Sequence, residues 1–318
     1  MSWRAQIRLG CAAAAIALAA EACGGQASLR PDPDEFRLTV PADEVSLTFQ
    51  ATDAHGLAVS DLKADEFQLR DDGKPPRRIL AFTSLQDAPI RAGILLDTSE
   101  SMLRDIAGNR AIANRYALQL MRQDTDRTFV MDFGFGSNLR QDWTSSGAVL
   151  STAIRSVAPG SANPLRGTAV IDAVFRACYY GFGKIDHAAS GNFILLFSDG
   201  EDNASHTSLA EAVDACQKAN TAIYAFRPAP QGANHSTGPQ MLAELASKTG
   251  GRVFHADESE AEADRDLRTI VAEVRNGYRL VYKPAELKHD GAFHSIELIG
   301  PDRVARIHVR SGYYAPER

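Results

Sequence analysis

Five side chains with oxygen donors stand out in the sequence by their types and spacing. Asp97, Ser99 and Ser101 occupy alternate positions, and Thr168 and Asp199 follow later in the chain. All five offer hydroxyl or carboxylate oxygens, and none offers a thiol or an imidazole. Hard oxygen donors favour Mg²⁺, Mn²⁺ or Ca²⁺ over zinc or copper. We therefore predict a divalent-metal site that holds Mg²⁺ (or Mn²⁺ or Ca²⁺).

The chemistry of such a site follows from the low charge of its ligands. Hydroxyl oxygens neutralise little of the charge of the ion, so the ion keeps water and stays electrophilic. An octahedral ion held from one side also leaves a coordination position for an oxygen from outside. A carboxylate of another molecule would complete that shell. We accordingly predict a protein partner that presents an Asp or Glu side chain.

The segments around these residues would bring them to one edge of a sheet. The segments 91–97 and 192–198 are almost continuously apolar, which is typical of parallel strands with helices on both faces. Helical spacing alternates with such strands, which predicts an α/β fold: a doubly wound, mostly parallel sheet with right-handed crossovers. Asp97 and Asp199 each lie at the carboxyl end of a buried strand, where open sheets place their ligand crevice. Thr168 precedes a predicted helix.

Three segments of the chain resemble the motifs of one family. Residues 97–101 (DTSES) match the D-x-S-x-S signature of von Willebrand factor type A domains, their metal-ion-dependent adhesion site. Residues 167–173 (GTAVIDA) are similar to the threonine loop of that family, and residues 197–203 (FSDGEDN) to its third loop. The resemblance covers about residues 90–276, and no part of the signature is missing.

This resemblance implies a Rossmann-like domain and a role for each candidate residue. Ser99 and Ser101 would coordinate the ion directly, and Thr168 would do so in ligand-bound forms. Asp97 and Asp199 would act mainly through water. The short D-x-S-x-S signature alone is weak evidence, because about one chain of this length in 15 would contain it at random. Turn formation and helix N-capping are the alternative roles of these residues.

Short alternating strands flank the central domain on both sides, in segments 36–88 and 277–316. Neither set is large enough to close a core alone. We predict that both sets meet in one β-sandwich from which the central domain, residues 90–276, emerges. The flanks also resemble an exported, acidobacterial-type bacterial group related to von Willebrand factor A. The strands are expected at 36–40, 45–52, 66–71, 78–83, 278–282, 293–299 and 305–310.

The N-terminus has the pattern of an export signal. Residues 1–22 combine two arginines, a small and apolar run, and small residues at the cleavage point. The run is too short to span a bilayer permanently. Cys23 follows the cleavage point, and the sequence before it resembles a bacterial lipobox with Ala and Glu at two of its positions. Lipidation of Cys23 and simple secretion both fit, and a tether at 23–35 follows in either case.

Two cysteines remain in the folded part, Cys178 and Cys216. Each falls in a predicted helix of consecutive βα units. An exported chain meets an oxidising compartment, where two neighbouring thiols can pair. Two buried and unpaired thiols are the alternative.

Composition narrows the function further. The net charge is −6, which leaves no basic surface for nucleic acid. Ser99 lies in no G-x-S-x-G elbow, and no residue has the pattern of a poised base or nucleophile, so we predict no enzymatic activity. Glu201 and Asp202 are expected to be exposed loop acids, and Asp172 a first-turn helix residue. An exported binding module is favoured over an envelope structural protein in which the metal only stabilises loops.

Overall fold

The computed structural model describes residues 44–160, 167–184, 190–228, 237–256, 259–286 and 288–315. The predicted signal peptide, the tether, Cys23 and the strand at 36–40 lie outside the described residues. No helix in these described ranges is long and apolar enough to cross a membrane.

A six-stranded sheet forms the centre of the α/β domain. Its strand order is β6-β5-β4-β7-β8-β9, with β6 antiparallel and the other strands parallel. The direction of winding reverses between β4 and β7, which is the topological switch point of such a sheet. The prediction of a doubly wound, mostly parallel sheet is confirmed. The strands are β4 (Ile90–Asp97), β5 (Arg127–Phe133), β6 (Ser137–Thr144), β7 (Gly191–Phe197), β8 (Thr221–Arg227) and β9 (Val253–His255).

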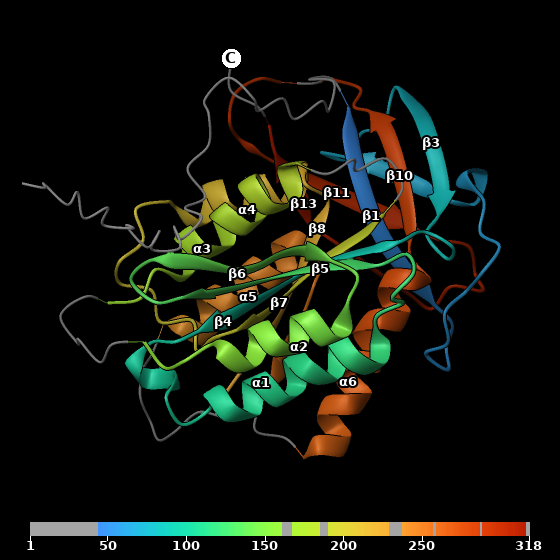
Figure 1. Cartoon of the computed structure of the whole chain (residues 1–318). Coiled ribbons are helices and arrows are strands. Elements are labelled where there is room, and N and C mark those ends of the chain that lie inside the picture. Colours follow the sequence, from blue (N-terminus) through green and yellow to red (C-terminus); the bar gives the residue numbers. More distant parts are fainter. Residues whose placement is uncertain are drawn as a thin grey trace, which may run out of the picture.

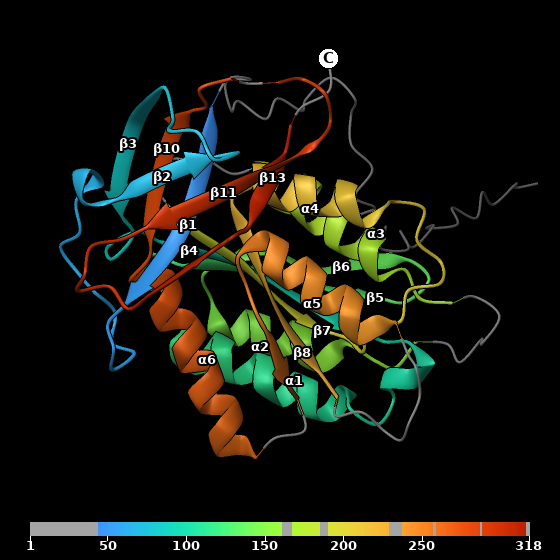
Figure 2. The same cartoon turned by 180° about the vertical axis from the view of Figure 1, so that it is seen from behind.

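Helices cover both faces of this sheet (Figures 1 and 2). The apolar run of β7 is explained by this arrangement, because Phe193 and Leu195 enter one core and Ile194 and Leu196 enter the other. One face carries α1 (Ile106–Arg115), α2 (Gly147–Ser156) and α6 (Glu260–Arg275), and the other carries α3 (Val170–Arg176), α4 (Leu209–Lys218) and α5 (Gly238–Thr249).

The ends of two helices differ from the sequence prediction. The pattern at 170–182 predicts one continuous α-helix, but α3 ends at Arg176 and continues as a π-helix, Ala177–Gly181. Likewise α1 continues as a π-helix, Tyr116–Leu120. Each π segment is only five residues long, which is too short to change the apolar spacing of the sequence visibly.

A disulfide joins Cys178 to Cys216 and so connects the end of α3 to α4. Both residues are at most 1% exposed. The alternative of two unpaired thiols is therefore wrong for this structure.

We expect the two cysteines of the purified, mature protein to resist alkylation until both denaturant and reductant are present. Burial alone would require only denaturant. Intact-mass measurement after iodoacetamide treatment separates the two cases. Labelling of both residues in denaturant without reductant would contradict the disulfide.

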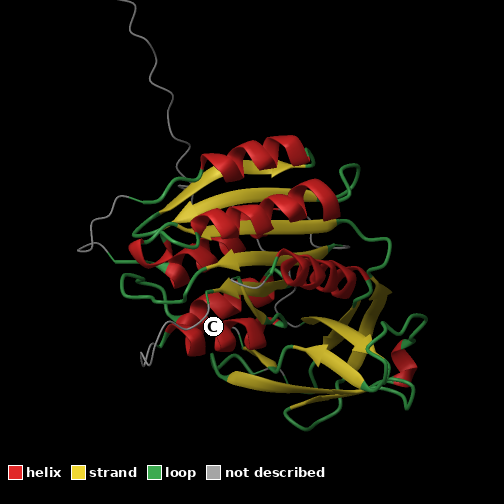
Figure 3. Ribbon diagram, turned by 90° about the horizontal axis from the view of Figure 1, so that it is seen from below, coloured by secondary structure: helices red, strands yellow, loops and turns green. Residues whose placement is uncertain are grey.

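The flanking strands form a β-sandwich, as predicted. β1 pairs with β10 and β12, β3 pairs with β10, and β11 pairs with β2 and β13, so each sheet combines early and late strands (Figure 2). The strands of the sandwich lie beside the α/β domain (Figure 3). The two sheets share one apolar core, which includes Phe49, Phe67 and Tyr282. The short strand β13 is not expected from the sequence. The strands are β1 (Val45–Thr52), β2 (Gln68–Asp71), β3 (Arg78–Ser84), β10 (Tyr278–Lys283), β11 (Phe293–Ile299), β12 (Arg306–Val309) and β13 (Gly312–Tyr314).

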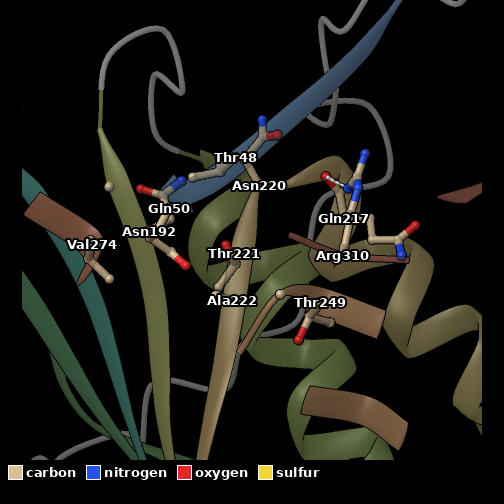
Figure 4. Close-up of a pocket in the computed structure, with 12 residues that line it drawn as sticks. Thr48, Gln50, Asn192, Gln217, Asn220, Thr221, Ala222, Thr249, Val274 and Arg310 are labelled. Carbon is tan, nitrogen blue, oxygen red and sulfur yellow. Dashed lines mark hydrogen bonds between the residues drawn. The ribbon is translucent and has the colours of Figure 1, made fainter. Parts of the chain in front are cut away.

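The sandwich docks on the α/β domain at the amino ends of β7 and β8. Arg310, between β12 and β13, is 7% exposed. Its Nη1 donates to the carbonyl of Gln217 (3.3 Å), near the end of α4, and its Nη2 donates to the carbonyl of Ser46 (2.8 Å), on β1. Gln217 in turn donates from Nε2 to the carbonyl of Gly312 (3.0 Å). Figure 4 shows Arg310 and Gln217 side by side in this joint.

A small polar cavity of about 20 Å³ lies within the same joint (Figure 4). Several buried polar atoms of its lining have no hydrogen-bond partner among the described residues, namely Gln50 Oε1, Gln217 Oε1, both amide atoms of Asn220, and Arg310 Nε. Polar cavities that can hold a water molecule are typically hydrated. The contact region between the sandwich and the α/β domain is therefore polar, whereas the three cores of the protein are apolar.

Candidate metal site

The loop after β4 holds the first three predicted ligands. Asp97 is the last residue of β4 and is fully buried. Its Oδ1 accepts a hydrogen bond from the Ser99 amide (2.9 Å), which turns the chain back over the carboxylate. The hydroxyls of Ser99 and Ser101 lie 3.2 Å apart, and Ser101 is exposed. The two hydroxyls thus lie next to each other in the loop that follows β4.

The second carboxylate oxygen of Asp97 is held from the neighbouring strand. Ser198, the first residue after β7, donates its hydroxyl to Asp97 Oδ2 (2.7 Å) and accepts from the amide of Gly200 (3.0 Å). Burial raises the pKa of Asp97 to about 6; the hydrogen bonds from Ser99 and Ser198 lower it, and the charge of Asp199 raises it. A divalent cation nearby would compensate this buried charge.

The threonine loop is fixed by the loop that follows β7. The Thr168 amide donates to Oδ1 of Asn203 (2.8 Å), and the Thr168 carbonyl accepts from the amides of Asn203 and Ala204 (both 3.1 Å). Asp202 Oδ2 accepts from the Ile171 amide (2.8 Å) at the start of α3. Asp202 therefore caps a helix and is not simply an exposed loop acid.

Asp172, expected as a first-turn helix residue, has a second structural role. Its carboxylate accepts from the amides of His206 (3.2 Å) and Thr207 (2.8 Å), in the loop before α4. Burial raises the pKa of Asp172, but the hydrogen bonds from Thr207 and His206 outweigh it and hold the pKa below its usual range. Asp172 and Asp202 together hold the loop after β7 against α3.

Asp199 starts the third loop, and a close backbone contact fixes its position. Asp199 is half-buried and accepts from the amide of Glu201 (3.0 Å). Gly200 has φ +83°, and a Cβ there would lie 2.5 Å from the carbonyl oxygen of Gly238. Only glycine fits this position, because both the backbone angle and the neighbouring helix start exclude a side chain.

These loops enclose an open cavity of about 540 Å³, called here the metal cavity. It lies at the carboxyl edge of the sheet, at the switch point between β4 and β7. Among the described residues of its lining there is no lysine, arginine, histidine or cysteine. The lining consists of Thr98, Ser99, Glu100, Ser101, Gly134, Phe135, Gly136, Asn138, Gly160, Gly167, Thr168, Glu201 and Asn203.

The oxygen atoms of this cavity fit a divalent cation. Ligands at about 2.1 Å from an octahedral Mg²⁺ lie about 3.0 Å from one another when adjacent. The observed 3.2 Å between the Ser99 and Ser101 hydroxyls is close to that spacing. Thr168 lines the same cavity, and Asp199 acts electrostatically on Asp97. The structure therefore places Ser99, Ser101 and Thr168 on the lining of one cavity, with Asp97 at the end of β4 and Asp199 in the loop after β7.

A second group with ligand-type atoms lies in the sandwich. Atoms of Asp71, Asp72 and His294 lie within 4.8 Å of one another. Asp71 Oδ2 already accepts from the hydroxyls of Tyr282 (2.7 Å) and Tyr313 (3.0 Å), and Asp72 accepts from the Ser295 amide (2.9 Å). These contacts explain the group as a hydrogen-bonded polar network in which Asp71 and His294 are buried and Asp72 is exposed.

Sequence reasoning missed three positioning residues, Ser198, Asn203 and Asp202. All three stand within the segment that resembles the third loop, but the sequence pattern alone indicates only an exposed loop acid at Asp202. Ser198 contacts Asp97, which lies 101 residues earlier in the chain. Asn203 contacts Thr168, 35 residues earlier, and Asp202 contacts Ile171 of α3, 31 residues earlier. A polar residue at the buried end of a strand, such as Ser198, was the one available signal.

We expect Ser198→Ala to weaken Mg²⁺ binding about tenfold without abolishing it. The hydroxyl orients Asp97, and loss of a residue that orients a ligand costs metal sites about 10- to 100-fold in affinity. Calorimetric titration measures the change. Ser190→Ala, a buried serine at the other end of β7, serves as control and should leave the affinity unchanged. Equal affinities of Ser198→Ala and wild type would contradict a positioning role.

The α/β fold and the positions of the three motifs agree with the von Willebrand factor A domain that the sequence resembles. A scan against models of protein families and a search of curated proteins found no match. Solved structures that align with this chain include BatB of Bacteroides thetaiotaomicron, with a TM-score of 0.47 and 18% identity over 57% of this chain and 97% of that protein.

Two further solved structures align with larger parts of the chain. Proximal thread matrix protein 1 of the mussel byssus, with a zinc-occupied MIDAS motif, has a TM-score of 0.48 and 16% identity over 65% of this chain and 50% of that one. A von Willebrand factor type A structure from Catenulispora acidiphila has a TM-score of 0.46 and 13% identity over 86% and 72%.

Proposed function

We propose that this chain is an exported binding protein of the von Willebrand factor A type. It holds a divalent cation through Ser99, Ser101 and Thr168, with Asp97 and Asp199 acting mainly through water. A carboxylate of a protein partner completes the shell of the ion. Mg²⁺ is the favoured ion, and Mn²⁺ and Ca²⁺ suit the same donors.

One observation carries this proposal: two paired hydroxyls above a buried carboxylate open into a cavity at the switch point of the sheet. Hydroxyl ligands leave the ion electrophilic, and the open side admits an oxygen from another molecule. The described lining offers hydroxyls, amides and the carboxylates of Glu100 and Glu201, and it offers no imidazole, thiol or amine. Binding is therefore favoured over catalysis.

Export is supported by the disulfide and by the pattern of the N-terminus. Disulfides such as Cys178–Cys216 persist in oxidising compartments and are rare in the cytosol. This is consistent with a periplasmic, envelope or secreted location. The attachment of a lipid to Cys23 is part of the sequence prediction and belongs to the same proposal.

The proposal is tested in two steps with the mature protein. Calorimetry first measures Mg²⁺ and Mn²⁺ binding, which we expect in wild type and not in Asp97→Ala. NMR titration then compares sodium acetate with acetamide on the Mg²⁺-loaded protein. Acetate should shift signals of the metal loops in the millimolar range, and acetamide or EDTA-treated protein should give no such shift.

The envelope structural protein is the second candidate, and the same experiment separates it. In that case Mg²⁺ raises the melting temperature, but acetate causes no metal-dependent shift. A protein that binds neither metal would contradict both candidates.

A further inference from the structure

The turn between β5 and β6 places one aromatic residue beside the metal cavity. The turn consists of Gly134, Phe135 and Gly136, and it is tied to both ligand loops. The Gly134 carbonyl accepts from the Ala169 amide (2.9 Å), next to Thr168 in the threonine loop. This tie fixes the turn against the threonine loop.

A second set of hydrogen bonds fixes the same turn against the Asp97 loop. Thr98 donates to the carbonyl of Phe133 from both its amide (2.8 Å) and its hydroxyl (2.9 Å). The Gly134 amide also donates to the carbonyl of Gly136 (3.0 Å) across the turn. The backbone that carries Phe135 is thus held from both sides of the cavity.

Phe135 is 54% exposed although it is a large apolar residue. A single exposed apolar side chain is ordinary on a protein surface and indicates nothing alone. The position of Phe135 is informative because it is the one apolar side chain among the described residues that line the metal cavity. A ring on a backbone held by these hydrogen bonds offers contact area at a lower entropic cost than a ring on a loop without them.

Charge restricts the partner further. Glu100 and Glu201 line the same cavity, and the described lining holds no basic residue. A bound Mg²⁺ attracts one carboxylate, but a second acidic group on the partner would approach these two glutamates. The cavity therefore favours a single acidic group with an uncharged neighbour.

We propose that Phe135 selects partners in which the metal-binding Asp or Glu stands next to an apolar side chain. The ring of Phe135 packs on that side chain while the carboxylate completes the shell of the ion. This inference rests on the proposed function, since it names the kind of partner that the same site takes.

The test compares two small carboxylates on the Mg²⁺-loaded mature protein by NMR titration. Acetate probes the metal alone, and 3-phenylpropionate adds an apolar group that can reach Phe135. We expect 3-phenylpropionate to bind about five- to tenfold more tightly than acetate, as burial of part of a ring would give. Phe135→Ala should remove this preference and leave acetate binding unchanged.

Two variants keep the result interpretable. Phe135→Leu retains an apolar side chain and should keep part of the preference, which separates packing from a disturbed turn. Leu57→Ala truncates another exposed apolar residue, which is 67% exposed and lies in the sandwich. This variant should keep the full preference for 3-phenylpropionate over acetate.

The outcomes separate the two proposals. If neither carboxylate shows metal-dependent binding, the proposed function itself fails. If both bind through the metal with equal affinity, or Phe135→Ala keeps the preference for 3-phenylpropionate, the inference about Phe135 is overturned and the proposed function stands. If 3-phenylpropionate still binds in EDTA, the inference about Phe135 is likewise overturned.

Discussion

Asp97→Asn should reduce Mg²⁺ affinity at least 100-fold while leaving the fold intact. The substitution keeps the size of a fully buried side chain and removes the charge that faces the ion. Asparagine can still accept from the Ser99 amide, but its NH2 group would face the Ser198 hydroxyl, which in the wild type donates to the second carboxylate oxygen, so the orientation of the side chain is disturbed as well. Loss of a group that orients a ligand lowers metal affinity about 10- to 100-fold. Loss of the nearest buried negative charge lowers the affinity further.

The same variant should behave differently in the absence of metal. A buried carboxylate without a cation is costly, because charges are poorly solvated in the interior. In EDTA we therefore expect Asp97→Asn to be at least as stable as wild type. If wild type binds Mg²⁺ with a Kd of about 0.1 mM, 10 mM Mg²⁺ should stabilise it by about 2.7 kcal/mol. Asp97→Asn should gain nothing from Mg²⁺.

Thermal unfolding with EDTA and with Mg²⁺ measures both effects. Asp132→Asn is the matched control, since Asp132 is 2% exposed and lies on the adjacent strand β5, where it pairs with Arg140. That variant should lose stability in both conditions and keep its gain from Mg²⁺. A gain from Mg²⁺ in Asp97→Asn equal to that of wild type would show that the ion binds elsewhere.

Local patterns carried the prediction of the fold and of the ligand set. β4 and β7 are apolar on both faces because each face meets a helical layer. A run of consecutive apolar residues in the sequence indicates such a strand. The ends of those strands in turn indicate Asp97 and Asp199, because each residue lies where an apolar run stops. The capping box at the start of α6 is a local pattern of the same kind, because it joins residues three apart, the N-cap Ser259 and Glu262.

Contacts between distant segments could not be predicted in the same way. The hydrogen bond from Ser198 to Asp97 spans 101 residues, and the pairing of Cys178 with Cys216 depends on the approach of two helices. The switch from α- to π-helix at Ala177 leaves no mark on the apolar spacing. These features depend on three-dimensional packing, so the sequence left them open or gave no sign of them.

Arg310 is the strongest case of such a contact, and Arg310→Met should destabilise the protein by about 3 kcal/mol. The guanidinium is buried, and it forms no salt bridge within the described part of the chain. Instead it donates to the carbonyl of Gln217 at the negative end of α4 and to the carbonyl of Ser46 on β1. Hydrogen bonds to a charged donor contribute about 1.5 to 3 kcal/mol each, partly offset by the cost of burying the charge.

Arg310→Lys should recover little of this stability. A lysine keeps the charge, but its compact ammonium cannot reproduce the planar fork that reaches two carbonyls on different domains. Urea unfolding followed by circular dichroism measures both variants. The joint lies at the amino edge of the sheet, opposite the metal cavity, so Mg²⁺ affinity should not change in either variant.

The matched control for the joint is Arg306→Met, which removes an exposed arginine from β12, a few residues before Arg310. Surface changes of this kind usually alter stability by less than about 0.5 kcal/mol. If Arg310→Met is as stable as Arg306→Met, the two carbonyl contacts contribute nothing and the sandwich is held by its apolar contacts alone. If Arg310→Met instead unfolds in two separate transitions, the guanidinium is what makes the sandwich and the α/β domain unfold as one unit.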